Sequence, residues 1–189
     1  MATTSTRKKT TTKTATNTTT KAAEKAVEMA PAAEPAKIVP KEIDMHQYIT
    51  VRNGFHGMLI YKSSRTGEMF NWPEFGSEQE MELQELRNAK NTSKAFFINN
   101  WFMFDDEFKW VIDYLGMGQY YRYAVDVEGF DDIFTKTPTE IKKIVSEMSD
   151  GQKKSLVYRA SDMITSGEID SRKVIAALED VLGIDLIEK

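Results

Sequence analysis

Three short apolar segments, separated by turn residues, begin the part of this chain that is rich in large side chains. Residues 48–51, 58–62 and 69–72 consist largely of aliphatic and aromatic residues, which is typical of β-strands. Phe70 and Trp72 alternate along the third segment, so their side chains share one face. Strands this short need other elements to cover them. We therefore expect a small antiparallel sheet that is covered by the helices that follow.

The residues between these segments predict how the strands connect. Asn53-Gly54 is a strong turn pair because both residues tolerate a positive φ. Residues 63–67 have the length of a five-residue hairpin loop, and Gly67 suits its left-handed position. The three segments are therefore expected to pair in sequence order, as a three-stranded antiparallel meander.

Capping sequences predict where helices begin after the last strand. Ser77 opens an S-x-x-E box, Thr137 opens a second box with proline at the first helical position, and Ser149 opens an S-x-x-Q box. Further starts are predicted at Asp105 or Asp106 and at Asp170 or Ser171, and glycines end the last two helices at Gly167 and Gly183.

Together these patterns predict an α+β fold. It contains a small antiparallel three-stranded β-meander and a predominantly helical C-terminal part of about five helices, with a disordered N-terminal tail. Residues 1–42 are expected to form a disordered arm and linker rich in Thr, Lys, Ala and Pro. Residues 43–136 are expected to hold the meander, helices and an aromatic block, and residues 137–189 a C-terminal three-helix subdomain.

The arm is basic whereas the rest of the chain is acidic. Residues 1–21 carry five Lys or Arg side chains and no acid, and they lack side chains large enough to form a core. Residues 47–189 carry 17 Lys or Arg against 24 Asp or Glu, a formal charge of −7. Four cations of the arm are possible polyanion contacts: Arg7, Lys8, Lys9 and Lys13.

The residue types of most catalytic and metal sites are scarce. The chain has no cysteine, and its two histidines, His46 and His56, lie near Asp44 without the spacing of a zinc site. The carboxylate pairs Asp105-Asp106 and Asp131-Asp132 each precede an apolar helical stripe, so helix capping explains them better than acid–base chemistry. We therefore expect no enzymatic activity, no metal site and no cofactor.

Aromatic residues are dense enough to suggest a docking surface. Seven of the nine residues from Phe96 to Phe104 are large and apolar, more than one short element usually buries on one side. The expected partner-binding residues are Tyr61, Arg65, Phe70, Trp72, Phe75, Phe97, Trp101 and Phe102. Core packing is the alternative explanation for the aromatics. Lys62 and Arg65 beside aromatic residues also leave a nucleic-acid surface open.

Nothing in the sequence indicates a membrane protein. No apolar run approaches the roughly 20 residues that a membrane-spanning helix needs. The cations at the N-terminus are not followed by the apolar region of a secretory signal. Synthesis in a reducing cytoplasm is consistent with the absence of cysteine.

Three runs of residues resemble a known group of proteins. They are the run from Tyr61 to Glu68, the spaced residues from Trp72 to Leu86, and Phe96-Phe97-x-x-Asn100-Trp101. Residues 149–155 and 167–171 add to the likeness. These segments resemble small proteins encoded among the structural genes of tailed bacteriophages, over residues 43–189.

The resemblance implies a virion-associated structural or assembly protein of the capsid or tail. Such a protein would be assembled in the bacterial host cytoplasm, bind other virion proteins and form part of a multi-subunit assembly. The alternative is a phage nucleic-acid-binding or regulatory protein that uses its basic N-terminal tail.

Overall fold

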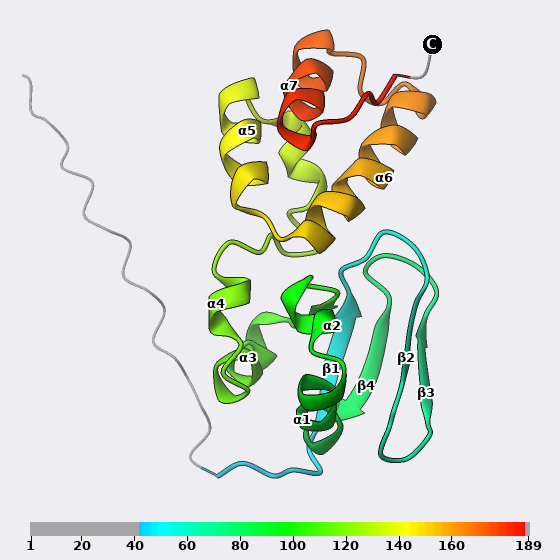
Figure 1. Ribbon diagram of the computed structural model, residues 1–189, viewed down its shortest axis with the longest axis vertical. Coiled ribbons are helices and arrows are strands. Elements are labelled where there is room, and N and C mark those ends of the chain that lie inside the picture. The colour runs from blue at the N-terminus through cyan, green and yellow to red at the C-terminus, as the bar shows by residue number, and fades with distance from the viewer. Residues whose placement is uncertain (1–41, 188–189) are drawn as a thin grey trace, which may run out of the picture. The chain divides into compact units, whose positions relative to one another are not determined.

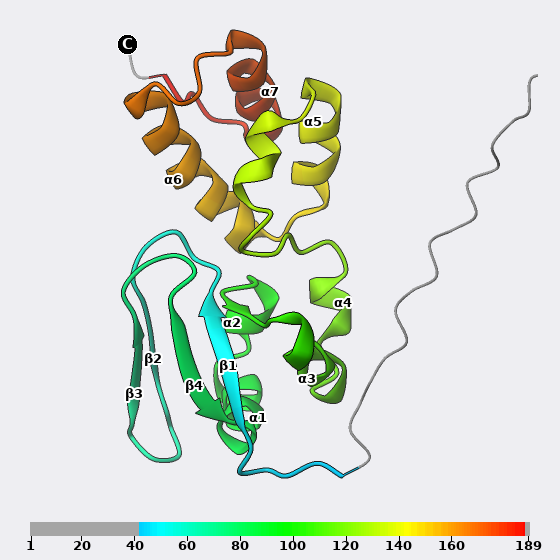
Figure 2. The same ribbon diagram turned by 180° about the vertical axis from the view of Figure 1, so that it is seen from behind.

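The computed structural model describes residues 42–187, which form an α+β fold as predicted (Figure 1). The predicted disordered tail up to residue 41, with Arg7, Lys8, Lys9 and Lys13, lies outside the described residues. The strands within 42–187 lie in two small antiparallel sheets (Figure 1 and Figure 2).

The central strand is β1 (Tyr48–Asn53). It pairs with β4 (Glu78–Glu82) on one side and with the two-residue strand β5 (Phe102–Met103) on the other. The hairpin of β2 (Leu59–Lys62) and β3 (Met69–Trp72) forms a separate sheet. The three predicted strands are therefore present, but the predicted meander is wrong because β1 does not pair with β2.

Asn53 explains why the chain leaves β1 without forming a hairpin. Its side-chain amide donates to the carbonyls of Gly57 and Glu74, and its side-chain oxygen accepts the N–H of Phe55. Gly54 donates its N–H to the carbonyl of Trp101 at 2.8 Å. These bonds reach as far as Glu74 and Trp101 and satisfy the N–H groups of Gly54 and Phe55, so the chain leaves β1 without a hairpin and crosses to a second sheet.

The predicted helix start at Ser77 is also wrong. Residues 78–82 form β4, in register with β1 through pairs such as Val51 and Gln79. The Ser77 hydroxyl accepts the N–H of Glu74 in a turn and does not cap a helix. The helix α1 (Leu83–Thr92) begins only where this strand pairing ends.

The last three helices begin and end close to the predicted residues. They are α5 (Pro138–Glu147), α6 (Asp150–Ser166) and α7 (Arg172–Leu182). Thr137 forms a complete capping box with Glu140, whereas Ser149 accepts the N–H of Gln152 without a return bond from that side chain. Gly167 and Gly183 end α6 and α7 in the left-handed conformation.

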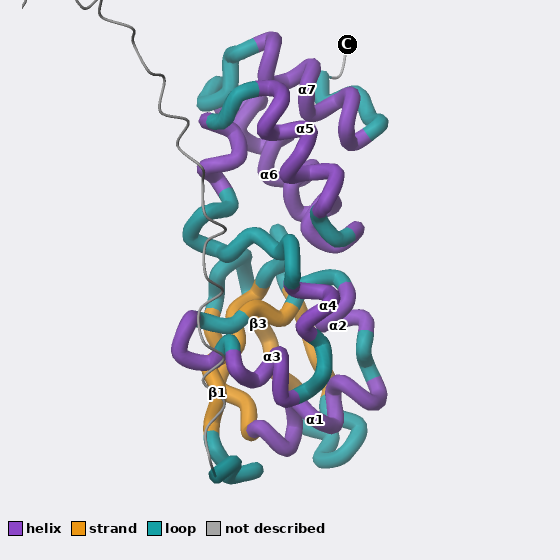
Figure 3. Tube along the Cα trace, turned by 90° about the vertical axis from the view of Figure 1, so that its left-hand side faces the viewer, coloured by secondary structure: helices purple, strands orange, loops and turns teal. Residues whose placement is uncertain are grey.

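The buried apolar side chains form two clusters. The first combines the strands and α1 with α2 (Ala95–Ile98), α3 (Trp110–Tyr114) and α4 (Gly118–Tyr121). The second combines the 3₁₀ turn at Asp131–Thr135 with α5, α6 and α7 (Figure 3). The boundary that the sequence predicts at residue 137 stays a prediction, although Phe130, Ile133 and Phe134 pack with the second cluster.

Direct contacts join the two clusters near the start of α6. The Ser155 hydroxyl donates to the carbonyl of Gly54 at 3.1 Å and accepts the N–H of His56. Gly151 lies so close to Asn99 that an added Cβ would be 2.2 Å from its carbonyl oxygen. The first turn of α6 therefore packs tightly against the loop that follows α2.

Candidate docking surface

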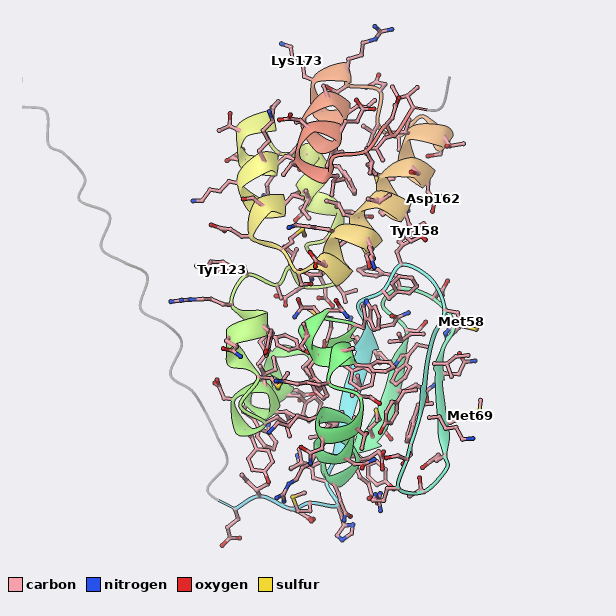
Figure 4. All side chains as sticks on the ribbon, viewed as in Figure 1. Met58, Met69, Tyr123, Tyr158, Asp162 and Lys173 are labelled. Atoms are coloured by element: carbon pink, nitrogen blue, oxygen red, sulfur yellow. The ribbon has the colours of Figure 1, made fainter. Side chains whose placement is uncertain are left out.

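The outer face of the β2–β3 hairpin carries exposed apolar side chains. Alternation along the strands turns Leu59, Tyr61, Phe70 and Trp72 into the core. The opposite face presents Ile60 and Met69, which are 46% and 62% exposed, and Met58 just before β2 is 61% exposed. Met58 and Met69 point outward from the hairpin in Figure 4. We call Met58, Ile60 and Met69 the hairpin face.

The loop of the hairpin is held by local hydrogen bonds. The buried Ser63 hydroxyl accepts the backbone N–H groups of Arg65 and Thr66 at 3.1 and 3.0 Å. Gly67 adopts a φ of +78°, as the loop prediction requires. This geometry fixes the register of β2 on β3, and with it the side chains that face outward.

A buried carboxylate ties the hairpin to α1. Glu85 accepts the Tyr61 hydroxyl at 2.7 Å, the Asn88 amide at 3.0 Å and the Arg65 guanidinium at 3.1 Å. Glu85 is only 2% exposed. The hairpin is therefore bonded to a helix at its loop end as well as packed on the core through its inner face.

The electrostatics of this network follow from burial and hydrogen bonding. Burial raises the pKa of Glu85, but hydrogen bonds from Asn88, Ser63, Tyr61 and Arg65 outweigh it and hold the pKa below its ordinary value. Burial, together with the hydrogen bond to Glu85, raises the pKa of Tyr61 to about 12. Glu85 is thus an ionised acid at neutral pH, and Tyr61 remains a neutral donor.

Most of the predicted partner-binding aromatics belong to the core. Tyr61, Trp72, Phe97 and Phe102 are at most 1% exposed, and Phe70 is buried beside them. Their rings pack on one another, for example Trp72 on Phe102 with ring centroids 5.3 Å apart. The interpretation of these five rings as a docking surface is therefore corrected, because a closed core leaves no ring for a partner to contact.

The three other predicted residues are more accessible. Arg65 is exposed but is engaged with Glu85, and Phe75 is half-buried against Phe130 with ring centroids 5.0 Å apart. Trp101 is half-buried between Phe55 and Phe96, and its indole nitrogen has no hydrogen-bond partner among the described residues. Within the described part of the chain, no ring contact, ion pair or hydrogen bond joins these three side chains to one another or to the hairpin face.

Sequence reasoning missed the hairpin face, although its signal was present. The sequence pattern predicts Met58, Ile60 and Met69 only as strand residues, and the density of aromatic side chains points to those as contacts. The same alternation that places Phe70 and Trp72 on one face requires Met69 to lie on the other. Once Phe70 and Trp72 are assigned to the core, the alternation therefore predicts that Met69 is exposed.

Acidic side chains that were interpreted as helix caps form ion pairs instead. Asp105 precedes a 3₁₀ turn without capping it, and its carboxylate lies 2.8 Å from Nε of Arg52. Asp131 forms a bidentate pair with Arg159 at 2.9 and 2.6 Å. The capping interpretation of Asp105 and Asp131 is wrong, because neither side chain accepts a capping N–H and each is paired with a cation from another element.

An open cleft of about 640 Å³ is lined by two groups of ion pairs, one around Arg52 and one around Lys109. Arg52 contacts Glu78, Asp105 and Glu128, while Lys109 contacts Asp106 and Asp126; all but Glu78 line the cleft. Burial lowers the pKa of Lys109, but hydrogen bonds to Asp106 and Asp126 raise it above its ordinary value. The cations of the cleft are therefore already paired with carboxylates.

The two histidines lie beside different carboxylates and do not form a shared site. His46 Nδ1 lies 3.7 Å from a Glu82 carboxylate, and His56 Nδ1 lies 3.9 Å from Asp162. Within residues 42–187, no group of three or more His, Cys, Asp or Glu side chains is placed to hold a metal ion. The same range contains no helix long and apolar enough to cross a membrane.

Comparisons with known proteins add no relative. No family model, no curated protein and no solved structure matches this chain.

Proposed function

We propose that this chain is a non-enzymatic structural or assembly component of a tailed-phage virion that docks onto other virion proteins. The observation that carries the proposal is the hairpin face, where Met58, Ile60 and Met69 are exposed on an ordered two-stranded sheet. Exposed apolar groups in one place are typical of protein–protein contacts.

The anchoring of the hairpin supports this role. A docking surface binds more tightly when its backbone is already ordered, because less conformational entropy is lost on binding. Here Glu85 holds the loop end through Tyr61 and Arg65, and the inner face is packed on the core. The methionines add side chains that adapt to a partner surface.

The polar groups of the chain support a structural role as well. The carboxylates first considered for acid–base chemistry, Asp105 and Asp131, lie in ion pairs with Arg52 and Arg159. The buried Ser155 hydroxyl bridges backbone groups of Gly54 and His56. These contacts stabilise the fold at the positions where they occur.

Mass spectrometry of gradient-purified particles from the phage that encodes this chain tests the proposal. We expect the chain in a fixed copy number per particle. Met69→Lys should weaken association with particles or particle precursors about tenfold, because a charge replaces an apolar contact. Thr66→Lys, an equally charged change in the hairpin loop, is the matched control. Absence of the chain from particles and from their precursors contradicts the proposal.

The basic N-terminal segment favours one alternative, a phage nucleic-acid-binding or regulatory protein. Arg7, Lys8, Lys9 and Lys13 occur without a neighbouring acid. The hairpin does not add to this alternative, because Tyr61, Phe70 and Trp72 are buried and offer no face to a base. A gel shift of the full chain that weakens steeply with salt, without particle association, would favour this alternative.

A further inference from the structure

Within residues 42–187, the outer edge of β2 has backbone groups without partners. Ser63 donates its N–H to the carbonyl of Glu68, which makes them a hydrogen-bonded pair of the hairpin. Hydrogen-bonded pairs alternate along an antiparallel ladder. Ile60 and Lys62 therefore turn their N–H and C=O groups away from β3.

No other element of residues 42–187 covers that edge with a ladder. β2 pairs only with β3, and none of the backbone hydrogen bonds between elements reaches Ile60 or Lys62. The edge of β3 differs, because the Gln79 amide donates to the carbonyl of Asn71 at 3.2 Å. The hairpin thus has one edge next to β4 and one edge, that of β2, whose outward N–H and C=O groups have no partner within residues 42–187.

The free edge is complementary to itself. When two β2 strands lie antiparallel around a two-fold axis at Ile60, each Ile60 exchanges both backbone hydrogen bonds with Ile60 of the second copy. Lys62 then lies opposite Met58 of the second copy, so no like charges face each other. Ile60 and Met58 are both exposed and apolar, which suits a central pair and its neighbour.

We propose that two copies of this chain pair through the β2 edge to form a continuous four-stranded antiparallel sheet in the order β3-β2-β2-β3. The pairing closes on itself, because both copies use the same edge around one two-fold axis. It also doubles the hairpin face, since Met58, Ile60 and Met69 of both copies lie on the same side of the sheet. This goes beyond the proposed function, because the dimer forms without any particle.

Sedimentation equilibrium of the full chain, up to about 100 µM, tests the pairing. We expect a dimer for the unsubstituted chain. Ile60→Lys and Ile60→Glu should each weaken dimerisation about tenfold or more, because like charges then face each other at the two-fold axis. An equimolar mixture of the two variants should dimerise again, as opposite charges meet. Circular dichroism confirms that each variant remains folded.

Met69→Lys separates edge pairing from packing of one hairpin face on another. It changes the same face but lies on β3, so the dimer should persist. A monomeric unsubstituted chain overturns the inference, as does a dimer that Met69→Lys dissociates while the Ile60 variants do not. A monomer that is present in particles would overturn only the dimer. A dimer that is absent from particles and precursors would overturn only the proposed function.

Discussion

At the scale of single residues, Glu85 shows how a buried charge sets the position of a surface. Its carboxylate is enclosed between α1 and the hairpin loop, and it accepts bonds from Tyr61, Asn88 and Arg65. A buried charge is tolerated only when such partners compensate for the loss of water. The same bonds that satisfy Glu85 therefore hold the loop end of the hairpin in place.

Replacing Glu85 with Gln should destabilise the fold by about 1–3 kcal/mol, because the charge-assisted bonds are lost and donors are left partly unsatisfied. Glu80→Gln, at an exposed position of β4, is the matched control and should change stability by less than about 0.5 kcal/mol. Urea denaturation followed by circular dichroism measures both. Equal effects of the two substitutions would contradict this role for Glu85.

The same variant predicts a pH dependence of stability. Because the folded-state pKa of Glu85 lies below its ordinary value of 4.5, its ionised form contributes stability above that pH. The contribution is lost as the pH falls through the folded-state pKa. The stability difference between the unsubstituted chain and Glu85→Gln should therefore shrink on acidification. A difference that grows as the pH falls would contradict the assignment.

At the scale of elements, sequence patterns predict the turns and helix starts that are determined by hydrogen bonds between nearby residues. The hairpin loop and the starts of α5 and α6 agree with the sequence because Ser63, Thr137 and Ser149 form hydrogen bonds to residues close to them in the chain. The chain from Glu78 to Glu82 has no local preference for a strand. It becomes β4 through pairing with β1, which lies some 30 residues earlier in the sequence. The capping box at Ser77 does not indicate this pairing.

The candidate docking surface also depends partly on local sequence and partly on long-range contacts. Alternation along each strand, together with the register that the hairpin loop sets, places Ile60 and Met69 on the same face, and the sequence indicates both. Which of the two faces is buried depends on the covering elements, such as the Phe96 and Phe102 rings that pack on Tyr61. The ion pair of Arg52 with Asp105 also joins distant segments, so neither spacing nor composition indicated it.

Removal of a cap gives a prediction at this scale. Thr137→Ala should destabilise α5 and the cluster it packs in by about 0.5–2 kcal/mol, because the N–H of Glu140 loses its acceptor. Thr139→Ala removes the same groups from an exposed position within the helix, and we expect a smaller loss. Thermal unfolding of both variants makes the comparison. A larger effect of Thr139→Ala would show that the capping box is not the stabilising feature.

At the scale of the whole described chain, the two clusters depend on a close contact at Gly151. The backbone of α6 approaches Asn99 so closely that no side chain fits between them. Ser155, one turn later, adds hydrogen bonds to the loop after β1. The start of α6 thereby joins the helices of the second cluster to the loop after β1, in addition to contacts such as that of Phe75 with Phe130.

Gly151→Ala should destabilise the fold by about 1–3 kcal/mol, since the added Cβ would lie 2.2 Å from the Asn99 oxygen. This is opposite to the roughly 1 kcal/mol gain that alanine gives over glycine within a helix. Gly129→Ala is the control, because nothing lies within 4 Å of its added Cβ. Chemical denaturation measures both variants. A stabilised Gly151→Ala would show that the two clusters do not press together here.

The bonds around Asn53 also have a chemical consequence. In an Asn-Gly sequence the backbone nitrogen of the glycine readily attacks the side-chain carbonyl carbon of the asparagine and expels its amide nitrogen as ammonia. Water then opens the resulting cyclic imide to aspartate or isoaspartate. In the fold the Gly54 N–H is held by the Trp101 carbonyl, and the Asn53 amide is held by the carbonyls of Gly57 and Glu74. The nitrogen and its target are thus kept from reacting. Deamidation at Asn53 would accumulate in proportion to the time that a molecule has spent unfolded.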